Sequence, residues 1–191
     1  MPQSNAKKII SLGVTLFTIT VITGLILGVV HDITLEPIRL TQEKLKSEAL
    51  QGVLPGAEEF NAVQKAEDAD PIIKDIQEAL SDGKTLGHCI TVTPRGYGGT
   101  IELVAGIKND GKLNAIRILN HSETPGLGAK SVLPEFYEQF TDIDKAAVVK
   151  REPETPGEIQ AISGATITSN GVTNGVNVAL EYWRSHLAEG E

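Results

Sequence analysis

A short run near the end of the chain, "AISGATITSNGV" at residues 161–172, gathers hydroxyl and amide side chains among glycines and other small residues. Within it, Ser163 and Thr166 flank Gly164 and Ala165, and a helical pattern begins at or shortly after Thr166. A helix N-terminus presents unpaired N–H groups and partial positive charge, so it can bind a phosphate. The alternative is that a hydroxyl only caps the helix, from Thr166, Thr168 or Ser169. Both interpretations use the same N–H groups, and these residues alone leave both open.

A second run, "TPRGYGGTI" at residues 93–101, places glycines on both sides of Tyr97. This arrangement is typical of a flexible loop that lies against a flat ligand, with the tyrosine ring as a stacking face. The run is not a GxGxxG between a strand and a helix, so it does not predict a dinucleotide site. The alternative is an ordinary turn between strands, in which Tyr97 covers the edge of the core.

A third run, "HSETPGLGAK" at residues 121–130, follows a strand-like stretch. Backbone amides around Gly126 and Gly128 could form a concave nest that binds a carbonyl group or an anion. His121 and Glu123 could act as a proton-transfer pair. The alternative is a loop whose histidine and glutamate are simply solvated. The order of residues does not predict a Ser–His–Asp arrangement.

The composition excludes several classes of function. With 25 acidic and 17 basic residues the formal net charge is −8, and no basic stripe is visible, so nucleic acid is not an expected partner. A single cysteine, Cys89, allows neither an internal disulfide nor a cysteine-ligated metal centre. The four histidines lack ligand spacing, so we expect no metal site.

Residues 9–30, "IISLGVTLFTITVITGLILGVV", form an uncharged run long enough to cross a bilayer, which needs about 20 residues. Threonine hydroxyls inside such a helix can bond back to carbonyls of the preceding turn. A cleavable signal peptide is the alternative, but its apolar region is shorter and ends in a small-residue cleavage site, which "GVVHDITLEP" does not offer. Lys7 and Lys8 precede the run and Asp32 follows it. The positive-inside bias therefore predicts a single-pass inner-membrane protein with residues 1–8 in the cytoplasm and the rest on the periplasmic or outer side.

The elements that must position the three motifs follow the apolar run. We expect a helical and loop connector at residues 31–84, a folded domain at 85–188 and a short tail at 189–191. The connector should hold a helix at residues 40–56 that ends at Pro55-Gly56, and a short helix in "PIIKDIQEAL" at residues 71–80. The apolar side of the first helix comes from Leu40, Leu45, Ala49, Leu50 and Val53.

In the domain, "HCITVTP" alternates like a strand, and residues 99–121 predict two strands around a turn at 109–111. The last segment has one apolar side at helical spacing, made of Val172, Val176, Ala179, Leu180, Trp183 and Leu187. Strands followed by a helix that packs on them predict an α+β fold.

Taken together, "PRGYGG", "HSETPGLGAK" and "SGATITS" behind one N-terminal anchor resemble the FMN-binding domain of respiratory electron-transport complexes. The chain is most similar to the G subunit of the Rnf complex, a membrane ferredoxin:NAD oxidoreductase coupled to ion transport. The C subunit of the sodium-translocating NADH:quinone oxidoreductase is a related alternative. The resemblance runs from the anchor to about residue 180, and it makes residues 85–188 an FMN-binding domain.

The resemblance implies that Thr166 carries FMN covalently, through a phosphodiester installed by a separate flavin transferase. It also implies partners among the other membrane and peripheral subunits of the complex. Thr166 would be a site of modification, and no residue of the chain would be catalytic, because the flavin supplies the redox chemistry. The implied cofactor-binding residues are Thr166, Ser163, Gly164, Ala165, Thr124, Gly126, Leu127, Gly128, Glu123 and Tyr97.

One position departs from the family pattern, because Gln160 stands where the modification signal often has aspartate, three residues before the serine. Two further functions stay open: a non-catalytic anchored module that binds FMN or another phosphate ligand reversibly, and a structural subunit in which Thr166 is only a cap.

Overall fold

The computed structural model describes residues 3–188, and side chains from Lys7 onward. The predicted tail at 189–191 lies outside the described residues. The chain divides into two compact units, residues 1–44 and 45–191. The first described element is the helix α1 (Gln3–Val53), which continues through Pro37 and ends just before Pro55, as the sequence predicts.

The apolar part of α1 is exposed along its length, and among the described residues α1 is the one helix long and apolar enough to cross a membrane. Three threonine hydroxyls in it donate to carbonyls one turn earlier: Thr15 to Ser11, Thr18 to Val14 and Thr20 to Phe17, at 2.8–2.9 Å. These bonds satisfy the hydroxyl donors within the helix, so the threonines are compatible with a hydrocarbon environment.

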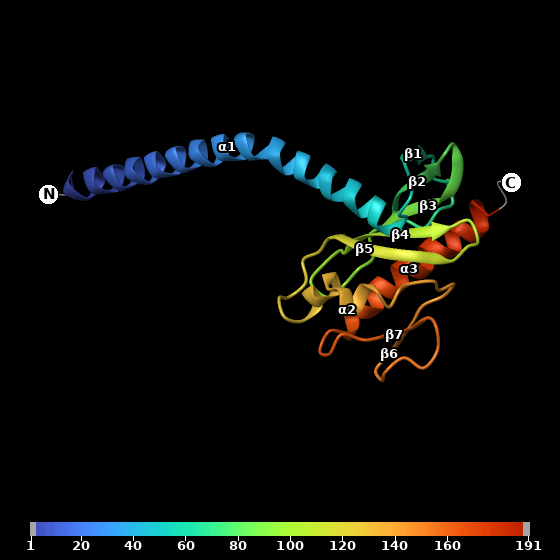
Figure 1. Cartoon of the computed structure of the whole chain (residues 1–191). Coiled ribbons are helices and arrows are strands. Elements are labelled where there is room, and N and C mark those ends of the chain that lie inside the picture. The colour runs from blue at the N-terminus through green and yellow to red at the C-terminus, as the bar shows by residue number, and fades with distance from the viewer. Residues whose placement is uncertain (1–2, 189–191) are drawn as a thin grey trace. The chain divides into compact units, whose positions relative to one another are not determined.

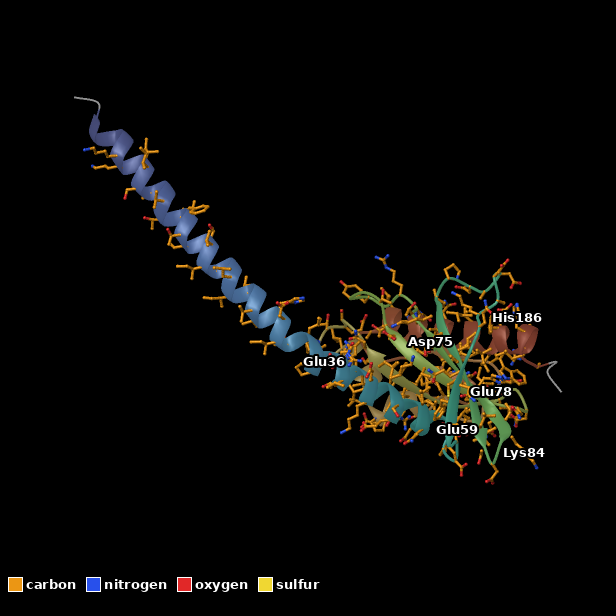
Figure 2. The ribbon with its side chains drawn as sticks, turned by 90° about the horizontal axis from the view of Figure 1, so that it is seen from above. Glu36, Glu59, Asp75, Glu78, Lys84 and His186 are labelled. Atoms are coloured by element: carbon orange, nitrogen blue, oxygen red, sulfur yellow. The ribbon has the colours of Figure 1, made fainter. Side chains whose placement is uncertain are left out.

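The second unit is built on a five-stranded antiparallel sheet in which each strand pairs with the next along the chain. The strands are β1 (Glu59–Val63), β2 (Ile73–Ser81), β3 (Lys84–Val92), β4 (Glu102–Lys108) and β5 (Leu113–Asn120). The predicted turn at 109–111 joins β4 to β5, with Gly111 at φ +79°. A second hairpin turn joins β2 to β3 at Asp82-Gly83, where φ values of +51° and +71° match a type I′ turn. Figure 2 shows Lys84 beside this turn.

The predicted short helix at residues 71–80 is wrong, because this segment is β2. Its buried residues, Ile73, Ile76 and Ala79, recur every three positions, which imitates a helix. The register shifts between Ile73 and Asp75, so Ile73 and Ile76 face the same side of the sheet. Ala79 faces the other side. The β-bulge therefore interrupts the two-residue alternation of buried and exposed side chains that marks a strand.

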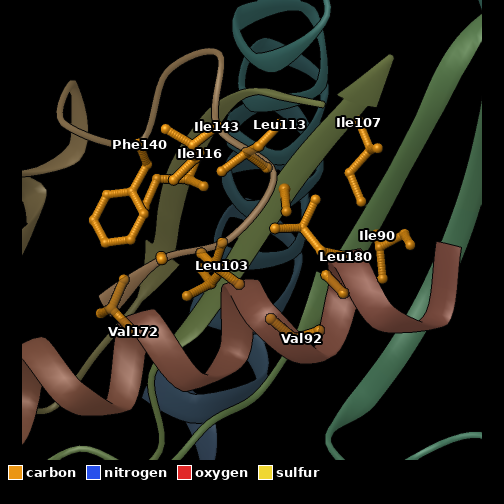
Figure 3. Packing of buried hydrophobic residues seen from close by; sticks show 14 of the residues in the cluster. Ile90, Val92, Leu103, Ile107, Leu113, Ile116, Phe140, Ile143, Val172 and Leu180 are labelled. Carbon is orange, nitrogen blue, oxygen red and sulfur yellow. The ribbon is translucent and has the colours of Figure 1, made fainter. Parts of the chain in front are cut away.

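The long helix α3 (Thr166–His186) covers one face of the sheet (Figure 1). Figure 3 shows Val172 and Leu180 of α3 pointing at Val92, Leu103 and Ile90 of the strands. All of these side chains are at most 1% exposed, and burial of each one stabilises the fold by about 1.5–3 kcal/mol. The predicted apolar side of the final helix is confirmed.

The other face of the sheet is covered by the end of α1. Leu50 and Val53 pack with Cys89 and Val104 in a second apolar cluster, whereas Leu45, predicted on the same side, is exposed. The approach is close enough that a Cβ at Gly106 would lie 2.6 Å from the Val53 carbonyl oxygen. The sheet is thus a middle layer between two helices, as expected for an α+β domain.

Short elements join β5 to α3. They are the 3-10 helix η1 (Gly128–Val132), the helix α2 (Pro134–Tyr137), and the parallel strands β6 (Ala147–Val149) and β7 (Glu158–Gln160). The "ETPGL" run directly precedes η1, and Ala161 and Ile162 join β7 to "SGAT". The two motifs meet at the start of α3, where a Cβ at Gly164 would lie 3.0 Å from Leu127 Cδ2.

Candidate functional site

The S-G-A-T motif forms a tight turn that leads into α3. The Ala165 N–H donates to the Ile162 carbonyl at 2.9 Å, and Gly164 has a φ of +77°. Glycine at the third position of a four-residue turn with positive φ matches a type II turn. The turn is held from inside α3, because the buried Ser169 hydroxyl accepts from the Ile162 N–H at 3.0 Å and donates to the Ala165 carbonyl.

Helix α3 begins without a side-chain cap. The residue before its first turn is Ala165, and no side chain accepts a hydrogen bond there. Within residues 3–188, the N–H groups of Thr166, Ile167 and Thr168 donate to no partner. The interpretation in which a hydroxyl of Thr166, Thr168 or Ser169 caps the helix is therefore wrong. The free amides are available to an anion.

The "ETPGLG" run forms a second turn of the same type. The Leu127 N–H donates to the Thr124 carbonyl at 3.2 Å, with Pro125 and Gly126 between them and Gly126 at φ +78°. The Ala129 N–H donates to the same carbonyl. Because the Leu127 N–H already donates to the Thr124 carbonyl, it cannot contribute a free amide to the predicted nest around Gly126 and Gly128. The tip of this turn meets the S-G-A-T turn, where a Cβ at Gly164 would lie 3.0 Å from Leu127 Cδ2.

The "PRGYGG" run folds into a small hairpin after β3. The Ile101 N–H donates to the Pro94 carbonyl and the Gly96 N–H to the Gly99 carbonyl, at 2.9 and 2.8 Å. Tyr97 lies at the tip and is 72% exposed. The alternative in which Tyr97 covers the edge of the core is wrong, because a side chain so exposed buries little apolar surface.

Glu123 connects the three motifs. It is 6% exposed; its Oε1 accepts from the Gly98 N–H at 2.9 Å, and its Oε2 accepts from the Thr168 hydroxyl at 2.5 Å. The His121 ring contacts the backbone of Glu123 and not its carboxylate, because His121 Nδ1 accepts a hydrogen bond from the Glu123 N–H. The carboxylate and imidazole are therefore not bonded to each other as a proton-transfer pair, and Glu123 is not a solvated loop residue.

The three motifs enclose a pocket of about 430 Å³, a volume within the range of cofactor sites. Its lining residues are Tyr97, Glu123, Thr124, Leu127, Gly128, Gly164, Ala165, Thr166, Ile167 and Thr168. The apolar part of the wall includes exposed Leu127 and Ile167 side chains, and the polar part is the first turn of α3.

Eight of the ten predicted site residues line this pocket. Ser163 lines a smaller neighbouring hollow together with Gln160 and Lys130, and Gly126 is exposed and lines neither hollow. Sequence reasoning missed Ile167 and Thr168 as lining residues. The signal was present, because residues in the first turn of a helix surround the same N-terminus as Thr166.

Comparison with known proteins shows the class of domain to which the pocket belongs. Residues 96–181 match the FMN-binding domain family, a range that contains the whole pocket. The fold is similar to that of the C subunit of the Na(+)-translocating NADH-quinone reductase from Parabacteroides distasonis. That match has a TM-score of 0.58 at 21% identity, covering 80% of this chain and 96% of the other. The second unit therefore contains an FMN-binding domain.

Relatives along the whole chain define the family. The chain is 32% identical over 184 residues to the G subunit of the ion-translocating oxidoreductase complex of Methanosarcina acetivorans, covering 94% of this chain and 97% of the relative. It is 36% identical over 162 residues to the G subunit of the proton-translocating ferredoxin:NAD(+) oxidoreductase complex of Clostridium ljungdahlii, covering 84% and 83%. The chain belongs to this family of G subunits of ion-translocating oxidoreductase complexes.

The pocket fits FMN in three respects. Unpartnered amides at the start of α3 suit the phosphate, and the apolar side chains of Leu127 and Ile167 suit a flat ring. Thr166 lines the pocket, and its hydroxyl makes no hydrogen bond to another described residue. The same pocket therefore offers backbone amides for the phosphate and apolar side chains for the ring.

Proposed function

We propose that this chain is the membrane-anchored flavoprotein subunit of an ion-translocating ferredoxin:NAD oxidoreductase complex, and that it relays electrons through FMN joined to Thr166 by a phosphodiester. The family membership and the FMN-binding domain support the redox role. Little turnover is expected from the chain alone, because a relay needs the redox centres of neighbouring subunits.

The observation that carries the covalent attachment is the environment of Thr166. Thr166 is the first residue of α3, is partly buried and lines the pocket, and its hydroxyl has no hydrogen-bond partner among the described residues. Attachment replaces the hydroxyl proton by phosphorus and leaves one negative charge on the phosphodiester. The unpartnered amides of Thr166, Ile167 and Thr168 would stabilise that charge.

The other proposed contacts orient the cofactor. Gly164 adopts the positive φ that directs the chain into α3 beside Leu127, and Ala165 and Gly128 are small residues of the same pocket wall. Tyr97, Leu127 and Ile167 would exclude water from the ring, and Thr124 and Glu123 contribute polar atoms to the same wall. When bound, FMN supplies the one- and two-electron redox chemistry, and the chain sets its position and potential. Ser163 and Gly126 would act through the shape of their turns.

The anchor and its orientation complete the proposal. Residues 9–30 of α1 would cross the cytoplasmic membrane, with Lys7 and Lys8 on the cytoplasmic side and the FMN-binding domain on the periplasmic or outer side. Maturation then needs a flavin transferase on the side where the domain lies.

The test is the intact mass of the full chain, coexpressed with a flavin transferase, followed by peptide mapping. We expect an added mass of FMN less water on the peptide that holds Thr166. Thr166→Ala should abolish it, whereas Thr166→Ser, which keeps a hydroxyl at the same place, should retain it in part. An unmodified wild-type mass, or flavin that stays on the Ala variant after denaturation, would overturn the covalent assignment and favour reversible binding.

A further inference from the structure

Glu123 is a buried carboxylate without a cation. Within residues 3–188 no lysine, arginine or histidine forms an ion pair with it, and the Gly98 N–H and the Thr168 hydroxyl are its two hydrogen-bond donors. Removing a charged carboxylate from water costs several kcal/mol, so such groups persist only where their hydrogen bonds are satisfied. Both contacts donate to the carboxylate oxygens, so each oxygen has one hydrogen-bond donor.

The glycines around the pocket make room for this side chain. A Cβ at Gly96 would lie 2.3 Å from Glu123 Oε1, and a Cβ at Gly128 would lie 2.2 Å from Oε2. Neither glycine has the positive φ that would explain its type by backbone conformation. Two segments, one at each carboxylate oxygen, thus lack side chains at the points where they contact Glu123.

We propose that Glu123 is the positioning residue of the flavin pocket: it ties the Tyr97 hairpin and the Thr124–Gly128 turn to the first turn of α3, and its negative charge opposes reduction of the bound FMN. The inference rests on the proposed function, because it assumes FMN in this pocket.

The positioning role follows from where the two bonds lead. One reaches the hairpin whose tip is Tyr97, and the other reaches Thr168, two residues after Thr166 and 0% exposed. Glu123 itself directly precedes Thr124, where the turn begins. Since a single side chain joins all three walls, its loss removes the hydrogen-bonded link between the hairpin tip and α3. The base of the hairpin still packs on α3, where a Cβ at Gly171 would lie 2.5 Å from the Arg95 carbonyl oxygen.

The electrostatic role follows from the same burial. Electrons added to a flavin increase its negative charge unless protons follow, and a charge in a pocket wall is screened far less than one in water. Glu123 lines the pocket and forms no ion pair with any described residue. A neutral residue of the same shape should therefore make reduction easier, and the midpoint potential should become more positive.

Two substitutions separate the roles. Glu123→Gln is isosteric and neutral; its amide oxygen can accept from Gly98 and its amide nitrogen can donate to the Thr168 oxygen. The Thr168 hydroxyl, which can no longer donate to a carboxylate, can then donate to a backbone carbonyl of the preceding turn. Glu123→Ala removes both bonds. Glu78→Gln is the matched control, because Glu78 also accepts from a threonine hydroxyl at 2.5 Å, that of Thr85, on the strands of the sheet (Figure 2).

The control site is remote from the pocket. Glu78 pairs in register with His88, whose ring bonds Trp183 near the other end of α3. At 1.5 Å per residue that end lies about 25 Å from Thr166.

The first measurement uses the full chain in detergent without flavin, in a Thr166→Ala background, and follows amide hydrogen exchange by mass spectrometry. We expect Glu123→Ala to accelerate exchange in the peptide containing Gly98 by about tenfold, the equivalent of one charge-assisted hydrogen bond. Glu123→Gln should restore most of the protection. Unchanged exchange in the Ala variant would overturn the positioning role, whatever the state of the flavin.

The second measurement is the midpoint potential of the full chain after modification by the transferase. We expect a positive shift for Glu123→Gln and none for Glu78→Gln. An unchanged or more negative potential in a fully flavinylated Glu123→Gln variant would overturn the electrostatic role. Failure of the wild-type chain to acquire flavin would instead count against the proposed function, so the two failures are distinguishable.

Discussion

Substitution of Gly128 by alanine tests the geometry of the pocket in the absence of cofactor. The added methyl group would lie 2.2 Å from Glu123 Oε2 and 2.6 Å from Thr168 Oγ1. Both distances are well below van der Waals contact, and both neighbours are buried. The methyl group must therefore separate the carboxylate from the Thr168 hydroxyl or displace η1.

Three contributions determine how much Gly128→Ala changes the free energy of unfolding. Overpacking of a buried site costs about 1–3 kcal/mol, and a buried hydrogen bond to a charged group contributes about 1.5–3 kcal/mol. These two costs overlap, since breaking the bond relieves the clash. Restricting the unfolded chain by replacing glycine returns about 0.4–1 kcal/mol. We expect a net loss of about 2 kcal/mol in the free energy of unfolding.

The assay is urea unfolding of the full chain, made without transferase and held at a fixed detergent concentration. Trp183 is the only tryptophan in the sequence and belongs to the core of the second unit, so its fluorescence reports that unit alone. With a slope of roughly 2 kcal/mol per molar urea, the midpoint should fall by about 1 M.

Gly126→Asn is the matched control, two residues away in the same run. Gly126 has a φ of +78° and open space around its Cβ position, and asparagine tolerates that conformation. We expect a midpoint within about 0.25 M of the wild type, from a change below roughly 0.5 kcal/mol. If Gly128→Ala is as stable as wild type, the close packing of Glu123 and Thr168 is not present in solution. If the control loses as much, the effect belongs to the turn and not to the missing space.

Two further predictions concern titratable groups on the sheet. Burial, with a smaller effect of Asp75, raises the pKa of the Cys89 thiol to about 12, so native protein at pH 8 should react with a disulfide reagent far more slowly than protein in urea; equal rates would contradict this. Burial lowers the pKa of His88, with Glu78 opposing the shift, so the folded state favours the neutral ring that accepts from Trp183 at 3.3 Å. Stability from this preference is present above the ordinary pKa of about 6.5 and is lost as the pH falls below it. The urea midpoint should therefore drop between pH 7 and 5.5 by more in the wild type than in His88→Gln, and equal drops would refute the assignment.

Much of the fold was predictable because its signals are local. The apolar run at residues 9–30, the helical spacing from Val172 to Trp183 and the turn at 109–111 depend on neighbours within a turn or two. The Asp-Gly pair that marks the turn at 109–111 also occurs at Asp82-Gly83, where the chain makes a second hairpin turn. The strand that precedes this second pair, β2, was concealed by a bulge, since the spacing of its buried residues is that of a helix.

The candidate site also has features that local sequence predicts and features that depend on distant segments. The start of α3 near Thr166 and the positive φ at Gly164 and Gly126 follow from short runs of sequence, because a tight turn involves only four residues. The sequence could therefore indicate an anion-binding helix N-terminus, and the resemblance to a family could assign FMN to it.

Only the tertiary structure decided what Glu123 does. Its two hydrogen-bond partners are 25 and 45 residues away along the chain, so no local pattern distinguishes it from a solvated loop residue. The same is true of Gly96 and Gly128, whose small size is required by the carboxylate and not by their own backbone. Local sequence determines which conformations a segment prefers, whereas burial, and the free-energy cost of an unsatisfied charge, depend on which distant segments fold against it.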